Sequence, residues 1–344
     1  MRKLLVVALL ITLGILLSGC RFGSENPEQV LTIYSERHYD TDRDIYALFE
    51  AETGIKVNLV RDSADPLITR LQNEGADSPA DLLIIADVGR LHRAKTFGLL
   101  QPVASTVLHE NIPENYRDDE GYWFGLTRRA RVIVYHPARV NPSELSTYEA
   151  LTDPVWANRV VTRTSTNIYN QSLMASFIAL WGEEAAKDWA AGLVANFARN
   201  PQGNDRDQAK ALLAGVADVA IMNTYYIGRM SVSSDPYEQE VAQTVGIFFP
   251  NQATTGTHVN ISAAGITQHA PNKEAAIRFL EFLVSETAQR LYADANFEYP
   301  INPAVEPHEL LTSWGAFKAQ DLPLSSLGVH ATQAMTLMDE VGWE

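Results

Sequence analysis

Two adjacent tyrosines, Tyr225 and Tyr226, follow an apolar run at residues 219–222. This arrangement suits the presentation of two phenol oxygens to one point better than the building of a core. A phenol ionises near pH 10, so it is a useful ligand at neutral pH only where a strongly Lewis-acidic cation replaces its proton. Fe(III) is a suitable ion, because hard cations favour anionic oxygen. The alternative is a loop with one buried and one exposed aromatic, since strand ends are rich in such residues.

The start of the chain predicts export and lipid attachment. A short basic segment precedes an apolar stretch over residues 4–17, which is short for a membrane span. The sequence LSGC that ends at Cys20 resembles the bacterial lipobox, in which cleavage precedes a cysteine that then carries the lipid. We therefore expect a signal peptide over 1–19, a flexible tether over 20–29, and a location in the periplasm or on the cell surface, anchored to a bacterial membrane. The alternatives are a plain secretory peptide with a stray cysteine, or a retained transmembrane anchor.

Length and charge restrict the class of protein. Roughly 325 residues remain after the predicted cleavage, which exceeds the usual limit of about 250–300 residues for one core, so two lobes are expected. The formal net charge of −15 argues against nucleic acid as a partner and is compatible with cationic cargo. The Gly-x-Ser-x-Gly, P-loop and His-Glu-x-x-His motifs do not occur, so we expect a protein that is not an enzyme.

Strand and helix patterns alternate along the chain and predict an α/β protein with two doubly wound lobes. The near-continuous apolar run at 81–85 is typical of a parallel strand buried on both faces. The expected strands are 30–34, 55–60, 81–85, 131–135, 219–222 and 261–266. The expected helices are 40–53, 65–74, 91–97, 171–180, 183–196, 205–214 and 273–296.

Ligands of open α/β sheets bind beyond the carboxyl ends of the strands. His38 and Tyr39 come shortly after the first predicted strand, and Tyr225 and Tyr226 come shortly after the strand at 219–222. Topology therefore predicts that these three tyrosines and one histidine lie at a binding cleft.

Six short segments, in this order and spacing, resemble the periplasmic ferric-iron-binding proteins of ABC importers. These proteins have the type II periplasmic-binding-protein fold, with two lobes joined by crossing hinge strands. The resemblance covers about residues 30–340. The His-Tyr pair after the first strand is similar to the pair found in the cyanobacterial-type subgroup. The segments are YSERHY at 34–39, ADVGRL at 86–91, RARVIVY at 129–135, NIYNQS at 167–172, PQGNDR at 201–206 and NTYY at 223–226.

The resemblance implies a set of ligands for Fe(III). Tyr225 and Tyr226 match the paired tyrosine ligands of the family, and Tyr169 matches a third. Tyr39 matches a fourth ligand, contributed by the first lobe. His38 matches a histidine that some members add, although it could instead cap the neighbouring helix.

The resemblance also implies charge balance near the metal. Four phenolates exceed the charge of Fe(III) by one, so a nearby cation is expected, and Arg131 is the candidate. In relatives that hold a carbonate-like synergistic anion, positions matching Arg131 and Thr166 contact that anion. This chain has both the His-Tyr pair and the Arg-Thr pair, so the sequence leaves the need for an anion open.

The resemblance further implies how the lobes and partners are arranged. The first lobe would comprise 28–128 and 253–303, and the second 129–252 and 304–344. Crossing strands near 131–136 and 258–266 would form the hinge. A monomer that delivers Fe(III) to an ABC permease and its ATPase is expected.

Other residues have more ordinary interpretations. Tyr34 is expected to be an inward-facing strand residue and not a ligand. Asn204 and Asp205 precede a helical run, where Asp is a good N-cap, although a role behind the metal ligands stays open. Three further arginines are interpreted as surface charges or salt-bridge partners: Arg37, Arg128 and Arg129.

Two rival functions remain. The first is a receptor of the same fold for an organic solute such as a thiamine-like, polyamine or phosphonate compound, which would not need tyrosines from three segments to converge. The second is a secreted enzyme, which is disfavoured because no nucleophile–base pair or paired-carboxylate set stands out.

Overall fold

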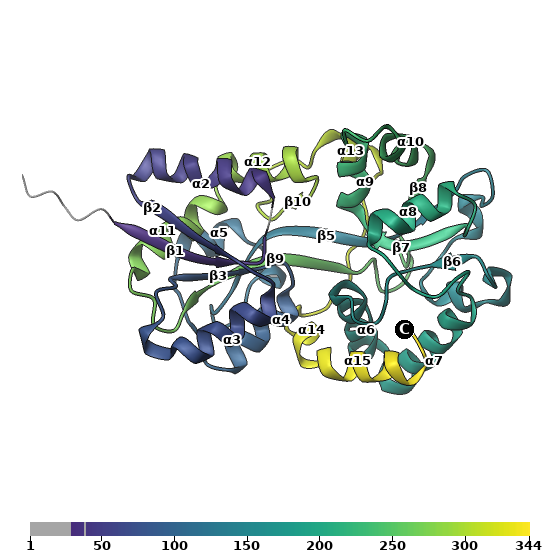
Figure 1. The fold of residues 1–344 in the computed structure, drawn as a ribbon, viewed down its shortest axis with the longest axis horizontal. Helices are drawn as coiled ribbons and strands as arrows, with labels where there is room; N and C mark the ends of the chain where they lie inside the picture. The colour runs from purple at the N-terminus through teal and green to yellow at the C-terminus, as the bar shows by residue number, and fades with distance from the viewer. Residues whose placement is uncertain (1–28, 38) are drawn as a thin grey trace, which may run out of the picture.

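A computed structural model describes residues 29–37 and 39–344 of the protein. One continuous sheet follows the long axis of the molecule, with helices on both sides (Figure 1). The strands are β1 (Val30–Ser35), β2 (Lys56–Arg61), β3 (Leu82–Ile85), β4 (Leu100–Gln101), β5 (Phe124–Tyr135), β6 (Val160–Val161), β7 (Val219–Asn223), β8 (Gly246–Phe248), β9 (Val259–Thr267) and β10 (Tyr299–Pro300). The mixed α/β class predicted from the sequence is confirmed.

The helices lie between these strands and after the last of them. They are α2 (Asp40–Thr53), α3 (Ala64–Glu74), α4 (Val88–Thr96), α5 (Thr106–Asn111), α6 (Ile168–Trp181), α7 (Glu183–Ala195), α8 (Asp205–Leu213), α9 (Thr224–Ser231), α10 (Pro236–Thr244), α11 (Lys273–Leu283), α12 (Glu286–Asn296), α13 (Glu309–Ser313), α14 (Ser325–Val329) and α15 (Ala331–Glu340). Short 3-10 turns lie at Gly75–Asp77, Glu114–Tyr116, Pro142–Glu144, Glu149–Thr152 and Pro154–Trp156. Within residues 29–37 and 39–344, no helix combines the length and apolar character needed to cross a membrane.

The sheet has the strand order β2-β1-β3-β9-β5-β7-β6. β1 pairs in parallel with β2 and β3, and β6 pairs in parallel with β7. The two central strands, β5 and β9, run antiparallel to each other and to their outer neighbours. The carboxyl ends of β1 and β7 therefore both point toward the middle of the molecule. Figure 1 shows the helices that follow these strands, α2 and α9, on the same side of the sheet.

The two central strands connect both halves. β5 pairs with β9 up to Ala130, and from Arg131 onward it pairs with β7. The phenol of Tyr148 lies at this change of partner, where it accepts a 3.1 Å hydrogen bond from the amide of His258 and donates to the carbonyl of Arg131. The lobe boundaries given above stay a prediction.

The core is apolar in both halves. All four residues of β3 are buried, as expected for a strand covered on both faces. In the other half, Phe177 stacks on Trp181 at 4.1 Å, and Trp189 packs between Phe177 and Trp343. The indole of Trp343 donates a 2.9 Å hydrogen bond to the carbonyl of Arg163, so the end of the chain supports the loop before α6.

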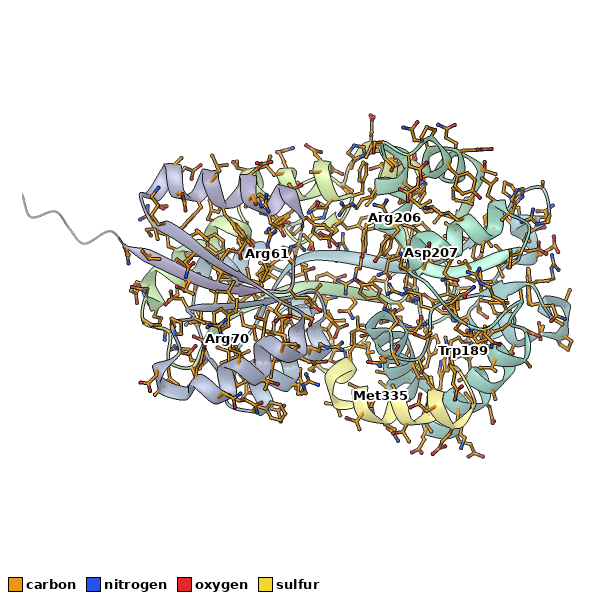
Figure 2. The ribbon with its side chains drawn as sticks, in the orientation of Figure 1. Arg61, Arg70, Trp189, Arg206, Asp207 and Met335 are labelled. Atoms are coloured by element: carbon orange, nitrogen blue, oxygen red, sulfur yellow. The ribbon has the colours of Figure 1, made fainter. Side chains whose placement is uncertain are left out.

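Several predicted elements differ from the structure. The helices expected over 91–97 and 171–180 each begin three residues earlier, at Val88 and Ile168. The helix expected over 273–296 is two helices. The first ends at Leu283, and Ser285 caps the second by accepting from the amide of Ala288. β5 is longer than the strand expected over 131–135, since its first half pairs with β9. The N-cap of α8 is Asn204 and not Asp205, and Figure 2 shows Arg206 and Asp207 in the first turn that it caps.

Candidate metal centre

The four predicted tyrosine ligands all lie at the start of helices that follow strands. Tyr39 is the N-cap of α2, directly after β1. Tyr169 is in the first turn of α6, and Tyr225 and Tyr226 are in the first turn of α9. A helix N-terminus carries a partial positive charge that favours anions, so each position suits an ionised phenol.

The structure brings these four side chains together. The hydroxyl oxygens of Tyr169 and Tyr225 lie 3.2 Å apart. The ring of Tyr225 stacks on that of Tyr226 with centroids 4.2 Å apart, and its edge meets the ring of Tyr39 at 6.5 Å. Tyr39 comes from the first half of the sheet and the others from the second, so the cluster joins both halves.

Burial favours the protonated form of three phenols of this cluster. Burial raises the pKa of Tyr39, Tyr225 and Tyr226, and the neighbouring phenols of the cluster raise the pKa of Tyr225 further. Ionisation therefore requires a cation that compensates for the lost contact with water.

Arginine side chains surround the cluster. The guanidinium of Arg129 lies 5.1 Å from the ring centroid of Tyr169, and that of Arg163 lies 5.6 Å from it. Arg37 and Arg229 lie 5.0 and 4.7 Å from the ring centroid of Tyr39. The charges of Arg129, Arg163 and Arg229 can offset the negative charge of phenolates, and the contacts of all four arginines with the ring faces are themselves favourable.

The sequence interpretation missed Arg129 at the cluster, as it missed Arg163 and Arg229. Arg129 is the most buried of the three. It is only 3% exposed, and its Nη1 has no hydrogen-bond partner among the described residues. Burial is the largest influence on its pKa and acts to lower it, but Tyr169 and Tyr225 raise the pKa enough for the net change to be upward. The alternation of side chains along a strand could have identified Arg129. Residues two apart in β5 share a face, so the prediction that Arg131 lies near the metal implied the same for Arg129.

The other arginines weighed in the sequence have different surroundings. Arg37 is buried and forms ion pairs with Asp42 at 3.2 Å and Glu298 at 3.0 Å, which agrees with the salt-bridge interpretation. Arg128 is half-buried and donates to the carbonyl of Pro300 at 3.2 Å. Only Arg37 of these two faces a tyrosine of the cluster.

Arg131 and Thr166, the two residues predicted to bind a carbonate-like anion, do not contact each other among the described interactions. Arg131 is buried beneath Tyr169, with its guanidinium 5.9 Å from the ring centroid, and its two Nη atoms bind Asp205, Asn223 and Asn170. Thr166 is exposed, and its hydroxyl lies 2.8 Å from that of Thr164. It lines a separate groove between α4, α6 and α14.

Two predicted site residues, His38 and Cys20, lie outside the described residues. Tyr34 is buried in β1, where its hydroxyl donates to the carboxylate of Glu74 at 2.9 Å, as expected for a residue that is not a ligand. Among the residues that the structure describes, no group of three His, Cys, Asp or Glu side chains could hold a metal ion. The tyrosine cluster is therefore the candidate centre.

Comparison with known proteins places the chain in a family. The family model of the bacterial extracellular solute-binding protein matches residues 35–290. The chain belongs to this family. It is 49% identical over 336 residues to the iron uptake protein A1 of Synechocystis, covering 96% of this chain and 93% of that protein.

Two solved structures are also similar. The Trichodesmium protein in complex with iron and citrate has a TM-score of 0.89 and 49% identity, covering 92% of this chain and 100% of that one. The ferric binding protein of Campylobacter jejuni has a TM-score of 0.87 and 43% identity, covering 91% and 100%. The chain therefore has the periplasmic-binding-protein fold and groups with the ferric iron-binding members, as the sequence resemblance predicted.

Membership of this family confirms three coarser predictions. The family consists of binding proteins, so the prediction that the chain is not an enzyme is confirmed. Its members work outside the cytoplasm. Such binding proteins serve ABC transporters, which gives the class of partner.

Proposed function

We propose that the protein captures Fe(III) through the phenolate oxygens of Tyr39, Tyr169, Tyr225 and Tyr226 and delivers it to an ABC permease. The observation that carries this proposal is the clustering of four tyrosines from three helix N-termini. The hydroxyls of Tyr169 and Tyr225 lie 3.2 Å apart, and the rings of Tyr39 and Tyr226 pack against that of Tyr225. An organic solute would need aromatic walls with a few polar groups, and not several phenol oxygens within reach of one ion.

Electrostatics support a trivalent cargo. Four phenolates bring a charge of −4, which leaves −1 after Fe(III) binds. Arg129 and Arg163 beside Tyr169, with Arg229 beside Tyr39, provide positive charge at the periphery. The charge of Arg37 is already paired with Asp42 and Glu298. We propose that the first three arginines balance the excess, and that His38, which directly precedes Tyr39, adds a fifth ligand. A carbonate-like anion with Arg131 and Thr166 is the alternative source of balance.

Capture would close the two lobes about the hinge formed by β5 and β9. Tyr39 belongs to the half that contains β1, and the other three tyrosines belong to the half that contains β7. Only a closed arrangement satisfies all four ligands, so the metal stabilises that arrangement. Small-angle scattering should show a smaller radius of gyration after loading than before.

We also propose that a lipid on Cys20 holds the protein at the membrane. The lipobox-like sequence before Cys20 supports this attachment. Cys20→Ser should move the exported protein from the membrane fraction to the soluble fraction. Recovery of the variant in the membrane fraction would contradict the lipid anchor without affecting the iron site.

The direct test is the colour of the loaded protein. Protein incubated with ferric citrate and then desalted should retain about one iron atom per chain and absorb visible light, because phenolate-to-Fe(III) charge transfer occurs there. Colourless, iron-free protein after desalting would contradict the iron site and favour the organic-solute alternative.

A further inference from the structure

The guanidinium of Arg131 binds two asparagines close in sequence to the candidate ligands, a buried carboxylate and a strand carbonyl. Its Nη2 donates to Asn170 Oδ1 at 2.5 Å and to the carbonyl of Ile221 at 3.3 Å. Its Nη1 donates to Asn223 Oδ1 at 3.1 Å and lies 3.5 Å from Asp205 Oδ2. Arg131 is 1% exposed, so these contacts are shielded from water.

Two of these partners, Asn170 and Asn223, lie at a helix start that carries a tyrosine of the cluster. Asn170 directly follows Tyr169, and its Nδ2 donates to the carbonyls of Arg163 and Thr164 in the loop before α6. Asn223 is the N-cap of α9, two residues before Tyr225. One planar guanidinium thus connects the starts of α6 and α9.

A buried carboxylate completes the connection. Asp205 Oδ2 accepts a 3.1 Å hydrogen bond from the amide of Asn223, and Asp205 is fully buried. The negative charge of Asp205 compensates that of Arg131, and both hold the first turn of α9. The rigid fork of an arginine suits this task, because several donors occupy fixed directions.

We propose that Arg131 is a positioning residue, which sets the distance between the hydroxyls of Tyr169 and Tyr225, and that it is not a ligand of an anion. Both of its Nη atoms are already engaged, so an anion that bound them would have to displace Asn170 or Asn223. Only its buried Nε has no hydrogen-bond partner among the described residues. Thr166, the other member of the predicted anion pair, faces the separate groove described above. The inference rests on the proposed iron site for its functional meaning.

Three variants and one control test this inference. Asn170→Ala removes the link to α6 and leaves every charge in place. The double variant Arg131→Gln/Asp205→Asn removes the arginine without leaving a buried carboxylate unpaired. Arg131→Lys keeps the positive charge but replaces the planar guanidinium, with its several fixed donors, by a single ammonium group. The control is Arg128→Gln, three residues earlier in the same strand, where the arginine binds Pro300 and Tyr116 and does not contact the cluster.

Iron affinity and the visible charge-transfer band are measured for each variant with and without bicarbonate. The three variants should lose 10- to 100-fold in affinity, as is typical when groups that orient metal ligands are removed. Their band should shift, and the loss should be equal in both buffers, whereas Arg128→Gln should match the parent. The inference would be overturned if Asn170→Ala kept the parental iron affinity and charge-transfer band. It would also be overturned if the double variant lost iron affinity only in the presence of bicarbonate.

A measurement on iron-free protein separates this inference from the proposed function. With 3-fluorotyrosine incorporated, ¹⁹F NMR resonances of Tyr169 and Tyr225, assigned by their Phe variants, should both shift in Asn170→Ala. Unchanged resonances would overturn the positioning role. If the parent binds no iron but the resonances shift, the proposed function fails and the positioning role stands.

Discussion

The hydroxyl oxygens of Tyr169 and Tyr225 lie 3.2 Å apart, although 56 positions separate the two residues in the chain. Two protonated phenols at this distance share one hydrogen bond, and two phenolates would repel each other. A cation between them removes the repulsion, so the pair is arranged for a ligand that replaces protons.

The first prediction tests the oxygens without disturbing the rings. Tyr225→Phe and Tyr226→Phe should each lose iron and colour on desalting, because each removes a proposed ligand atom. Loss of the hydrogen bond to Tyr169 should cost only about 1 kcal/mol of stability in Tyr225→Phe. Iron content, visible absorption and thermal unfolding of the variants are compared with those of the parent.

The matched control for these variants is Tyr299→Phe. Tyr299 is buried in the same apolar cluster as Tyr225, and its hydroxyl has no hydrogen-bond partner among the described residues. Tyr34→Phe is a weaker control, since Tyr34 binds Glu74. Iron retention by Tyr225→Phe and Tyr226→Phe equal to that of Tyr299→Phe would exclude the proposed ligand set.

The position of the site could be predicted from the sequence because it depends on local patterns. Apolar runs end shortly before Tyr39 and Tyr225, and the carboxyl ends of strands in an α/β sheet are where ligands bind. Burial of the run at 81–85 followed from its unbroken apolar character. These signals lie within a few residues of the groups that they place.

The surroundings of the site could not be predicted in the same way. The arginines around the cluster come from the segment between β1 and α2, from β5, from α9 and from the loop before α6, so they meet only after the chain folds. The partners of Arg131 lie 39 to 92 positions away in the sequence. The alternation of side chains along β5 indicates that Arg129 shares a face with Arg131. Nothing in the local sequence, however, distinguishes a buried arginine from an exposed one.

The second prediction concerns the pH dependence of iron binding. Burial keeps the pKa of Tyr39, Tyr225 and Tyr226 above that of a free phenol, so these three phenols keep their protons at neutral pH in iron-free protein. Each phenol that binds Fe(III) must release its proton, so affinity falls as pH falls. The slope of log affinity against pH should be smaller by about one in Tyr226→Phe than in the parent, while Tyr299→Phe keeps the parental slope. Equal slopes in all three proteins would mean that Tyr226 binds no metal.

The third prediction concerns acid stability at the crossing of β5 and β9. Burial lowers the pKa of His258 to about 3, and its Nδ1 lies 3.0 Å from Gln320 Oε1. In the unfolded chain the histidine titrates near pH 6.5, so the unfolded state binds the proton first as pH falls. The neutral histidine therefore contributes stability that is fully present above pH 6.5 and is lost as pH falls toward 3, by about 1.4 kcal/mol per pH unit.

Urea unfolding of iron-free protein at pH 7 and pH 5 measures this loss. His258→Gln should lose less stability between the two pH values than the parent, because a glutamine does not titrate. His109→Gln, a change at an exposed histidine on α5, should behave like the parent. If His258→Gln lost as much stability between pH 7 and pH 5 as the parent, other groups would be responsible for the acid sensitivity.

The fourth prediction concerns the contact between the two halves at Asp87. Its Oδ2 accepts a 2.6 Å hydrogen bond from the hydroxyl of Ser172 on α6 and a 2.7 Å bond from Asn260 on β9. The bond to Ser172 joins the loop after β3 to the helix that carries Tyr169. Hydrogen bonds to charged groups contribute about 1.5–3 kcal/mol, so Ser172→Ala should weaken the closed arrangement by about that amount.

Ser176→Ala is the matched control for this change. Ser176 is buried one turn further along α6, and its hydroxyl donates within the helix to the carbonyl of Leu173 at 2.7 Å. Small-angle scattering of iron-free protein should give a larger radius of gyration for Ser172→Ala than for Ser176→Ala, and iron should dissociate faster from Ser172→Ala. If both variants keep the parental radius and dissociation rate, the bond between Asp87 and Ser172 does not hold the two halves together, and closure depends on the tyrosine ligands alone.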